Sequence, residues 1–376
     1  MANATVVKCS ELVSRTSFPS YIAAIRNVTS NNFTLVDQCK SEICNALWGS
    51  GNPDISGVGM IVGYIVENVL GFTLVLALFV LRHRTRNQQA SKEKLQRYIS
   101  VATQGCSSFH SCASFFTFSI QLACIVVLAR LDFGISASGM GDSTAKITWA
   151  ISLLTMLPLL YVAFNPDLLR EPSAHTYGDE KFRRRIDREE QLRFLLFALC
   201  WLLFMYPFFS RMLENFGPSA IGGTSGHGQV ISTSDWDTVQ SICVANVQPI
   251  TPRELVAMKV FSVTGSLFVC LLALCKILWL ALKRQHRRSR LVHYIRECWL
   301  KRRSQESQLS IAMFIAIPII AVSQLWTMFR LRTFQEQVSH SSRNQDSDGQ
   351  WTFGQIAAVT IFVPVLVDCW FTWLYG

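Results

Sequence analysis

Seven long apolar runs, separated by charged or polar connections, are the feature that most restricts how this chain can fold. Each run is close to the roughly 20 residues that a helix needs to cross a hydrocarbon core about 30 Å thick. Backbone groups find no water inside that core, so a lone apolar run crosses it as a helix. The chain is therefore predicted to be an all-α integral membrane protein, a bundle of about seven transmembrane helices. The predicted spans are 57–81, 105–130, 147–168, 191–211, 255–282, 309–331 and 351–375.

Composition supports the membrane prediction and argues against a nucleic-acid partner. Of the 376 residues, 50% are hydrophobic and only 16% are charged, which is too apolar for an ordinary soluble protein of this size. The net charge of +10 would by itself suggest binding to nucleic acid. The basic residues, however, gather in three connections between apolar runs, as they do on the cytoplasmic side of multispanning proteins. The expected partner is the lipid bilayer.

The distribution of basic residues also predicts the orientation of the chain. With Arg193, just inside the fourth span, counted, the first-to-second, third-to-fourth and fifth-to-sixth connections hold six, seven and nine Lys and Arg residues. These are 22 of the 35 in the chain, whereas the other three connections hold five. The positive-inside rule makes the richer connections, 82–104, 169–190 and 283–308, cytoplasmic. The N-terminus is then luminal and the C-terminus cytoplasmic. Residues 1–54 form a luminal tail, and 55–376 form the seven-helix membrane domain.

The tail contains three N-x-S/T sequons, at Asn3, Asn27 and Asn32. Such sequons are glycosylated only on the luminal side of a secretory membrane, so they are candidate sites of modification. Together with the spans they predict a multi-pass glycoprotein of the endoplasmic reticulum or another endomembrane.

Four cysteines fall on the predicted luminal side, where disulfides persist: Cys9, Cys39, Cys44 and Cys243. Four thiols allow three pairings. A Cys39–Cys44 bridge would close a small loop, and Cys9 with Cys243 would join the tail to the fourth-to-fifth connection. The alternatives stay open. The spacing of these residues is not that of a zinc site, and no metal is predicted.

Ionisable side chains inside a membrane are costly, at roughly 2.5–3.5 kcal/mol on insertion scales, so they are the best functional candidates in this sequence. Glu67 lies near the middle of the first span, on a helical face with Gly59, Gly63 and Gly71. This stripe of small residues lets a neighbouring helix approach closely. Glu67 then has two readings: a hydrogen-bonding group between helices, or a neutral, proton-donating carboxylic acid in a pocket.

Other polar residues in the spans are weaker candidates. Asp368, near the end of the last span, is a second candidate catalytic acid; it either pairs with Lys276 or extends to the membrane surface. Asp167 lies at the end of the third span. His110, in the second span, is either a proton shuttle or a satisfied packing residue. Pro207, Pro318 and Pro364 are expected to kink their helices.

Motifs of soluble cofactor chemistry are missing from the sequence. It contains no P-loop, no HExxH, no GxSxG and no GxGxxG in a strand-to-helix context. No cofactor is predicted.

Residues Cys44–Gly59 read CNALWGSGNPDISGVG and run into the first span. This segment resembles the N-terminal signature of a group of filamentous-fungal polytopic proteins, some of which are encoded in indole-diterpene gene clusters of the paxilline type. The resemblance covers this segment and the general layout of spans, and it transfers no catalytic residue. It implies an endomembrane protein of fungal secondary metabolism. The implied partners are terpenoid or indole-diterpene intermediates and other membrane-bound enzymes of the pathway.

Two classes of function follow, and the sequence leaves open whether the chain is an enzyme. One is a membrane-embedded terpenoid cyclase, in which a buried carboxylic acid, Glu67, protonates an alkene or epoxide and aromatic walls protect the carbocation. The alternative is a non-enzymatic seven-span protein: receptor-like, a transporter, or a scaffold for pathway enzymes. Topology alone does not choose between these classes.

Overall fold

The computed structural model of the chain describes residues 39–48, 53–87, 92–130, 141–164, 180–216, 237, 240–244, 247–285, 303–341 and 351–375. Within these residues the elements are all helices. Two short helices come first: α4 (Lys40–Trp48) and α5 (Pro53–Ser56). The longer helices are α6 (Val58–Asn87), α7 (Lys92–Arg130), α8 (Asp142–Phe164), α9 (Glu180–Phe216), α11 (Pro252–Gln285) and α13 (Arg303–Ser341). The last span is built from α14 (Phe353–Thr360) and α15 (Val363–Tyr375).

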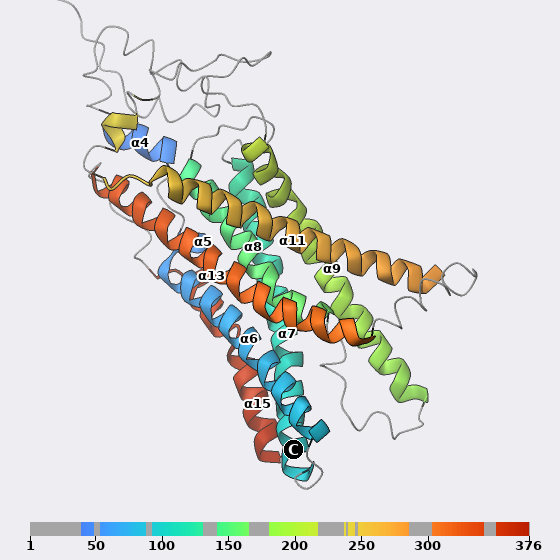
Figure 1. Cartoon of the computed structure of the whole chain (residues 1–376). Helices are drawn as coiled ribbons and strands as arrows, with labels where there is room; N and C mark the ends of the chain where they lie inside the picture. The colour runs from blue at the N-terminus through green and yellow to red at the C-terminus, as the bar shows by residue number, and fades with distance from the viewer. Residues whose placement is uncertain are drawn as a thin grey trace, which may run out of the picture.

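Among the described residues, seven helical stretches are long and apolar enough to cross a membrane, which confirms the predicted all-α, seven-span class. They are Pro53–Thr85, Leu95–Ala129, Asp142–Phe164, Gln191–Phe216, Pro252–Leu278, Ala312–His340 and Phe353–Tyr375. The short helix α4 lies at one end of the bundle and the C-terminus at the opposite end (Figure 1).

The helices extend further than the apolar runs. Most of the predicted loop 82–104 is helical, because α6 continues to Asn87 and α7 begins at Lys92. In the same way α9 begins at Glu180, inside the predicted loop 169–190. Lys, Arg, Gln and Glu are good helix formers, so a helix leaving the hydrocarbon core need not end there.

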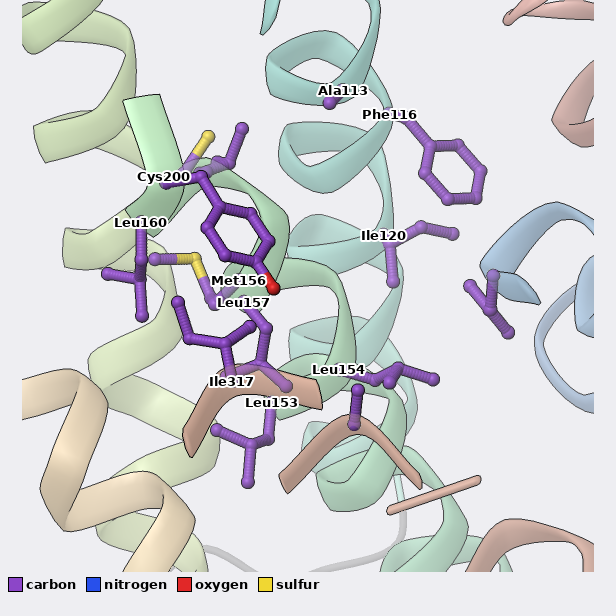
Figure 2. Close-up of a cluster of buried hydrophobic side chains, with 14 of the residues drawn as sticks. Ala113, Phe116, Ile120, Leu153, Leu154, Met156, Leu157, Leu160, Cys200 and Ile317 are labelled. Carbon is purple, nitrogen blue, oxygen red and sulfur yellow. The ribbon is translucent and has the colours of Figure 1, made fainter. Parts of the chain in front are cut away.

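Helix α8 is the centre of the bundle. It packs against α6, α7, α9, α11 and α13, and nearly all of its side chains are buried. Figure 2 shows its leucines and Met156 meeting side chains from three neighbours, including Phe116 of α7, Cys200 of α9 and Ile317 of α13. A helix that is apolar on every side is stable only when it is surrounded, and α8 is surrounded by protein. The outer helices instead expose apolar faces suited to lipid.

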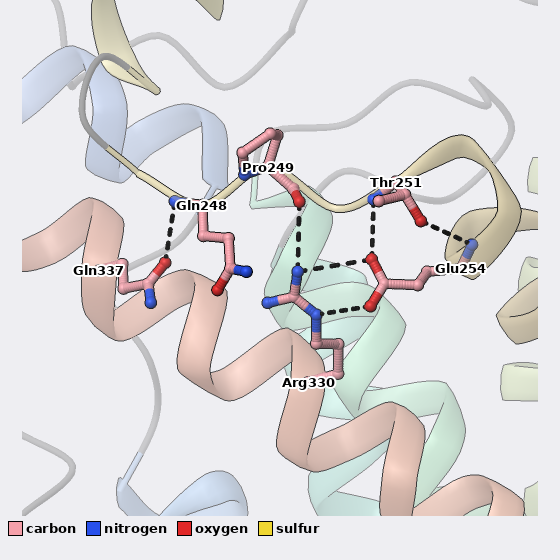
Figure 3. Close-up of polar contacts among 6 residues, drawn as sticks. All are labelled: Gln248, Pro249, Thr251, Glu254, Arg330 and Gln337. Carbon is pink, nitrogen blue, oxygen red and sulfur yellow. Dashed lines mark hydrogen bonds and ion pairs between the residues drawn. The ribbon is translucent and has the colours of Figure 1, made fainter.

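A polar clasp joins the start of α11 to α13 (Figure 3). Thr251 and Glu254 form a capping box, in which each side chain accepts a backbone N–H of the other, at 3.2 and 2.8 Å. Arg330 of α13 donates to both carboxylate oxygens of Glu254, at 3.0 and 3.4 Å, and to the carbonyl of Pro249. The N-terminus of α11 is thereby fixed against α13.

The last span is interrupted near Pro364, as predicted, whereas α9 and α13 each continue as one helix through Pro207 and Pro318. Helix α14 ends at Thr360 and α15 begins at Val363, immediately before Pro364. Pro364 has no N–H to donate to the carbonyl of Thr360, four residues earlier, so the helix is interrupted there.

A disulfide fastens the N-terminal segment to the bundle. Cys44 of α4 is bonded to Cys243, 199 residues away, and Cys39 is disulfide-bonded as well. The Cys39–Cys44 loop is therefore not formed, and neither is the Cys9–Cys243 link that would accompany it. Helix α4 is held against α8 and α13, and the carbonyl of Leu47 accepts a hydrogen bond from the Gly141 N–H at 2.9 Å. This packing brings the two distant cysteines together.

The remaining candidates of the tail, Asn3, Asn27, Asn32 and Cys9, lie outside the described residues, as does Asp167.

Candidate functional site

A layer of polar side chains crosses the middle of the bundle between α6, α7 and α8. All of its members are at most 2% exposed. Because buried polar groups are costly unless they are paired, such a layer must be hydrogen-bonded internally or serve a ligand. The members are Glu67 of α6, His110, Ser114, Thr117 and Gln121 of α7, and Thr148, Ser152 and Thr155 of α8.

One half of the layer is fully paired. The Ser152 hydroxyl donates to Gln121 Oε1 at 2.7 Å, and Gln121 Nε2 donates to the Ser152 carbonyl at 2.8 Å and to Thr155 Oγ1 at 3.3 Å. His110 Nδ1 is 2.8 Å from the Ser114 hydroxyl, one turn further along α7. His110 is thus a satisfied packing residue, one of its two predicted readings. These contacts hold α7 against α8.

Glu67 is the incompletely paired member. The Thr117 hydroxyl donates to the carbonyl of Thr155 at 2.9 Å and lies 3.4 Å from Glu67 Oε1. Glu67 Oε2 is buried and has no hydrogen-bond partner. A hydroxyl has one proton to donate, and the shorter contact to Thr155 takes it. Thr117 is then left only as an acceptor at this long contact, and a buried carboxyl group with no other partner is least costly in its neutral form. The geometry fits a neutral carboxylic acid.

An aromatic cluster joins the helices that carry Glu67 and Thr117 to the last span. Tyr64 of α6 packs on Phe116 of α7, with ring centroids 5.8 Å apart. Phe116 meets Phe362 edge-on at 5.6 Å, and Phe109 stacks on Phe362 at 6.0 Å. Phe362 lies at the break between α14 and α15. The electron-rich faces of such rings can stabilise positive charge.

The glycine stripe beside Glu67 is filled by neighbouring helices. A Cβ at Gly63 would lie 3.1 Å from the carbonyl oxygen of Ala358 in α14, and one at Gly71 would lie 2.8 Å from the Phe109 ring. The stripe therefore serves the close helix approach that its spacing predicts.

The start of the first span is clasped by a residue that the sequence did not single out. Gln355 of α14 accepts a hydrogen bond from the Gly59 N–H at 3.0 Å and donates to the Pro53 carbonyl at 2.9 Å. The Thr352 hydroxyl donates to Asp54 Oδ1 at 2.8 Å. A Cβ at Gly59 would lie 2.6 Å from the Gln355 Cβ. Much of the signature segment is thus explained by contact with α14. A glutamine near the start of a span reads as an ordinary boundary residue, so no signal marked it.

The second predicted acid, Asp368, is separate from the polar layer. It is partly exposed on α15, and its ion pair with Lys276 is not formed among the described residues. The Lys276 ammonium lies over the Phe164 ring instead, 5.8 Å from the centroid. Since a half-exposed carboxylate near a helix end can reach water, it needs no cation partner.

Among the described residues, no group of three or more His, Cys, Asp or Glu side chains could hold a metal ion. No protein-family model, curated protein or solved structure matches the chain.

Proposed function

We propose that this chain is a multi-pass endomembrane protein of fungal secondary metabolism, with a luminal N-terminus. Seven apolar helices support the membrane location, and the resemblance of Cys44–Gly59 to the fungal signature supports the pathway. The proposed partners are terpenoid or indole-diterpene intermediates and the membrane-bound enzymes that make or use them.

Within that setting we propose that Glu67 acts as a general acid in a terpenoid cyclisation. The observation that carries this proposal is that Glu67 Oε2 is buried without a hydrogen-bond partner. The neighbouring Thr117 hydroxyl donates its proton to the Thr155 carbonyl instead. A neutral acid in a dry site is the group that such a reaction needs.

The chemistry needs no co-reactant. The Glu67 O–H gives its proton to an alkene carbon or an epoxide oxygen, and the breaking π or C–O bond leaves a carbocation. An internal alkene attacks the cation and closes a ring. The final cation loses a proton, and the Glu67 carboxylate takes one up, so the overall change is an isomerisation. The cluster of Tyr64, Phe116 and Phe362 supplies ring faces that stabilise positive charge.

A non-enzymatic function is the second candidate, and a different observation favours it. The glycine stripe beside Glu67 is occupied by α7, α8 and α14. In a receptor-like protein, transporter or scaffold, Glu67 would only hydrogen-bond between helices, as polar groups in membrane bundles commonly do.

The test combines deletion of the gene with reconstitution. We expect the deletion strain to accumulate an uncyclised intermediate, and microsomes in which this chain is the only added protein to convert that intermediate to an isomer of the same mass. Microsomes from the same host without the chain are the control. An intermediate that accumulates but is not converted would exclude the enzyme and leave the non-enzymatic candidate. An unchanged metabolite profile would remove the pathway assignment itself.

A further inference from the structure

Arg211 is a buried cation near one end of the bundle. It lies on α9, five residues before the end of that helix at Phe216, or about 7–8 Å from the end along the axis. Only 3% of its surface is exposed. This is the end of the bundle where Lys259 of α11 donates to the carbonyl of Asn215 at 2.9 Å.

Neutral groups from two helices, α8 and α11, hold the guanidinium. Nη1 donates to the Ser262 carbonyl at 3.0 Å and to the Ser266 hydroxyl at 2.8 Å, both on α11. The guanidinium carbon lies 5.8 Å from the centroid of the Trp149 ring on α8. The Trp149 ring is itself fixed by a hydrogen bond from its Nε1 to the Ser210 hydroxyl at 3.3 Å. The orientation of the guanidinium is thus set in advance.

No carboxylate in the described part of the chain forms an ion pair with Arg211. Arg330 and Arg332 of α13 differ in this respect: Arg330 is 3.0 Å from Glu254, and Arg332 is 2.8 Å from Glu336. The nearest acid along α9, Glu214, lies one turn further on, and its buried Oε2 has no hydrogen-bond partner either. A buried cation without a counter-charge is costly.

The guanidinium also has unused donors. Both hydrogen bonds of Arg211 to described residues come from Nη1, so Nε and Nη2 donate to none of them. These two nitrogens are not among the fully enclosed unpaired atoms, so they keep some accessible surface. Nε and Nη2 form one edge of the planar guanidinium, the edge that binds two oxygens of a carboxylate or phosphate side by side.

The outward faces of α9 and α11 at this end of the bundle are apolar and open to lipid. Leu213 and Phe216 of α9 are exposed, as are Val260 and Phe261 of α11. In a bilayer these side chains contact acyl chains, and an arginine about 7–8 Å inside a helix end lies close to the headgroup region. A molecule that reaches this edge from the membrane therefore combines an anionic head with an apolar tail.

We propose that Arg211, positioned by Ser266 and Trp149, binds the oxyanion head of an amphiphile between α8, α9 and α11. The head is a carboxylate or a phosphate ester, and the tail lies along the exposed apolar side chains of α9 and α11. This site is independent of Glu67 and of the reaction proposed there.

The test measures thermal unfolding of the purified full chain in phosphatidylcholine nanodiscs. Three probes are added separately: sodium laurate, its uncharged match dodecanol, and phosphatidic acid included in the nanodisc. We expect laurate, phosphatidic acid or both to raise Tm by at least about 3 °C at saturation, and dodecanol to leave it unchanged. A shift with phosphatidic acid alone identifies a phospholipid head, and a shift with laurate alone a free carboxylate. No shift with either anion, or an equal shift with dodecanol, overturns the proposal.

Variants assign the shift to Arg211. Arg211→Gln should abolish it, and Arg211→Lys should reduce it because a lysine lacks the two-pronged edge. Arg211→Gln is expected to fold, since it removes a charge that no buried carboxylate needs. Ser266→Ala removes one hydrogen bond that positions the guanidinium, so it should reduce the Tm shift less than Arg211→Gln does. Arg332→Gln is the matched control and should keep the full shift. If Arg211→Gln keeps the shift, the anion binds elsewhere.

Discussion

The Thr117 hydroxyl lies between groups of two other helices and has a single proton to donate. It bonds to the Thr155 carbonyl of α8 and is oriented towards Glu67 of α6, while Thr117 itself belongs to α7. Proton counting then makes Glu67 the donor of the weaker contact, and leaves its second oxygen unpaired. An uncharged acid is also the form that a membrane interior tolerates at least cost. At the scale of single residues, hydrogen bonding and solvation thus agree on the protonation state.

The residue-scale prediction uses Glu67→Gln and Glu67→Leu. A glutamine amide can donate to Thr117 as the protonated acid does, so Glu67→Gln should keep the wild-type Tm. Glu67→Leu loses the bond and should destabilise the bundle by on the order of 1 kcal/mol. If Glu67 is the general acid, Glu67→Gln should be well folded and form no product, because an amide cannot protonate an alkene or epoxide at a useful rate. Product is measured in the microsomal assay.

Gly63→Leu is the matching control on the same face of α6. Its side chain would meet Ala358 of α14, where even a Cβ has only 3.1–3.2 Å, so assembly should fail whatever Glu67 does. Wild-type product from a well-folded Glu67→Gln protein would remove Glu67 from the catalytic candidates.

At the scale of elements, the first and last spans are held together by side-chain bonds to backbone groups. Gln355 of α14 bonds to Pro53 and Gly59, on either side of the α5-to-α6 junction. Glycine at position 59 lets α14 come close enough for these bonds. The signature segment therefore has a structural task, which is to receive the first turn of the last span.

The element-scale prediction is that Gln355→Leu lowers stability by about 1–3 kcal/mol. The substitution leaves the buried Gly59 N–H without its side-chain acceptor and removes one of the two hydrogen bonds to the Pro53 carbonyl, which keeps the bond from the Gly57 N–H at 3.1 Å. Gly59→Ala should also destabilise, since its methyl group would meet Gln355 and Trp351. Thr360→Val is the control, because the Thr360 hydroxyl bonds only within its own helix. Thermal unfolding in detergent is the measurement. Equal Tm values for Gln355→Leu and Thr360→Val would contradict the clasp.

The same elements show what could be predicted from the sequence. The seven spans and the buried position of Glu67 follow from hydropathy and from the cost of charge in a membrane, which are local properties. The partners of Glu67 and the role of Gln355 depend on how α7, α8 and α14 are rotated about their axes, and no local pattern sets those rotations. Arg211 falls on the last residue of the predicted fourth span and reads as part of a connection. Its burial could not be predicted from the sequence, because it depends on α9 continuing to Phe216.

At the scale of the whole molecule, two kinds of residue occupy opposite ends of the bundle. The Cys44–Cys243 disulfide joins α4 to the segment before α11 at one end. Arg82, Arg84 and Arg97 lie at the other end, where α6 finishes and α7 begins (Figure 1). Disulfides persist in oxidising compartments, and basic residues are retained in the cytoplasm. The two arguments are independent, and both favour the proposed orientation, with the disulfide end in the lumen.

The prediction at this scale is that the tail is glycosylated and that Cys44 and Cys243 remain bonded in the native protein. A glycosidase-sensitive mass should disappear when Asn3, Asn27 and Asn32 are replaced by Gln. Non-reducing peptide mapping should recover the Cys44 and Cys243 peptides joined, with Cys275, a free cysteine in the structure, as the control for artefactual oxidation. In sealed microsomes a tag at the C-terminus should be cleaved by added protease while the tail is protected. Cleavage of the tail and protection of the tag would reverse the orientation. The disulfide would then face a reducing cytoplasm, where it would not persist.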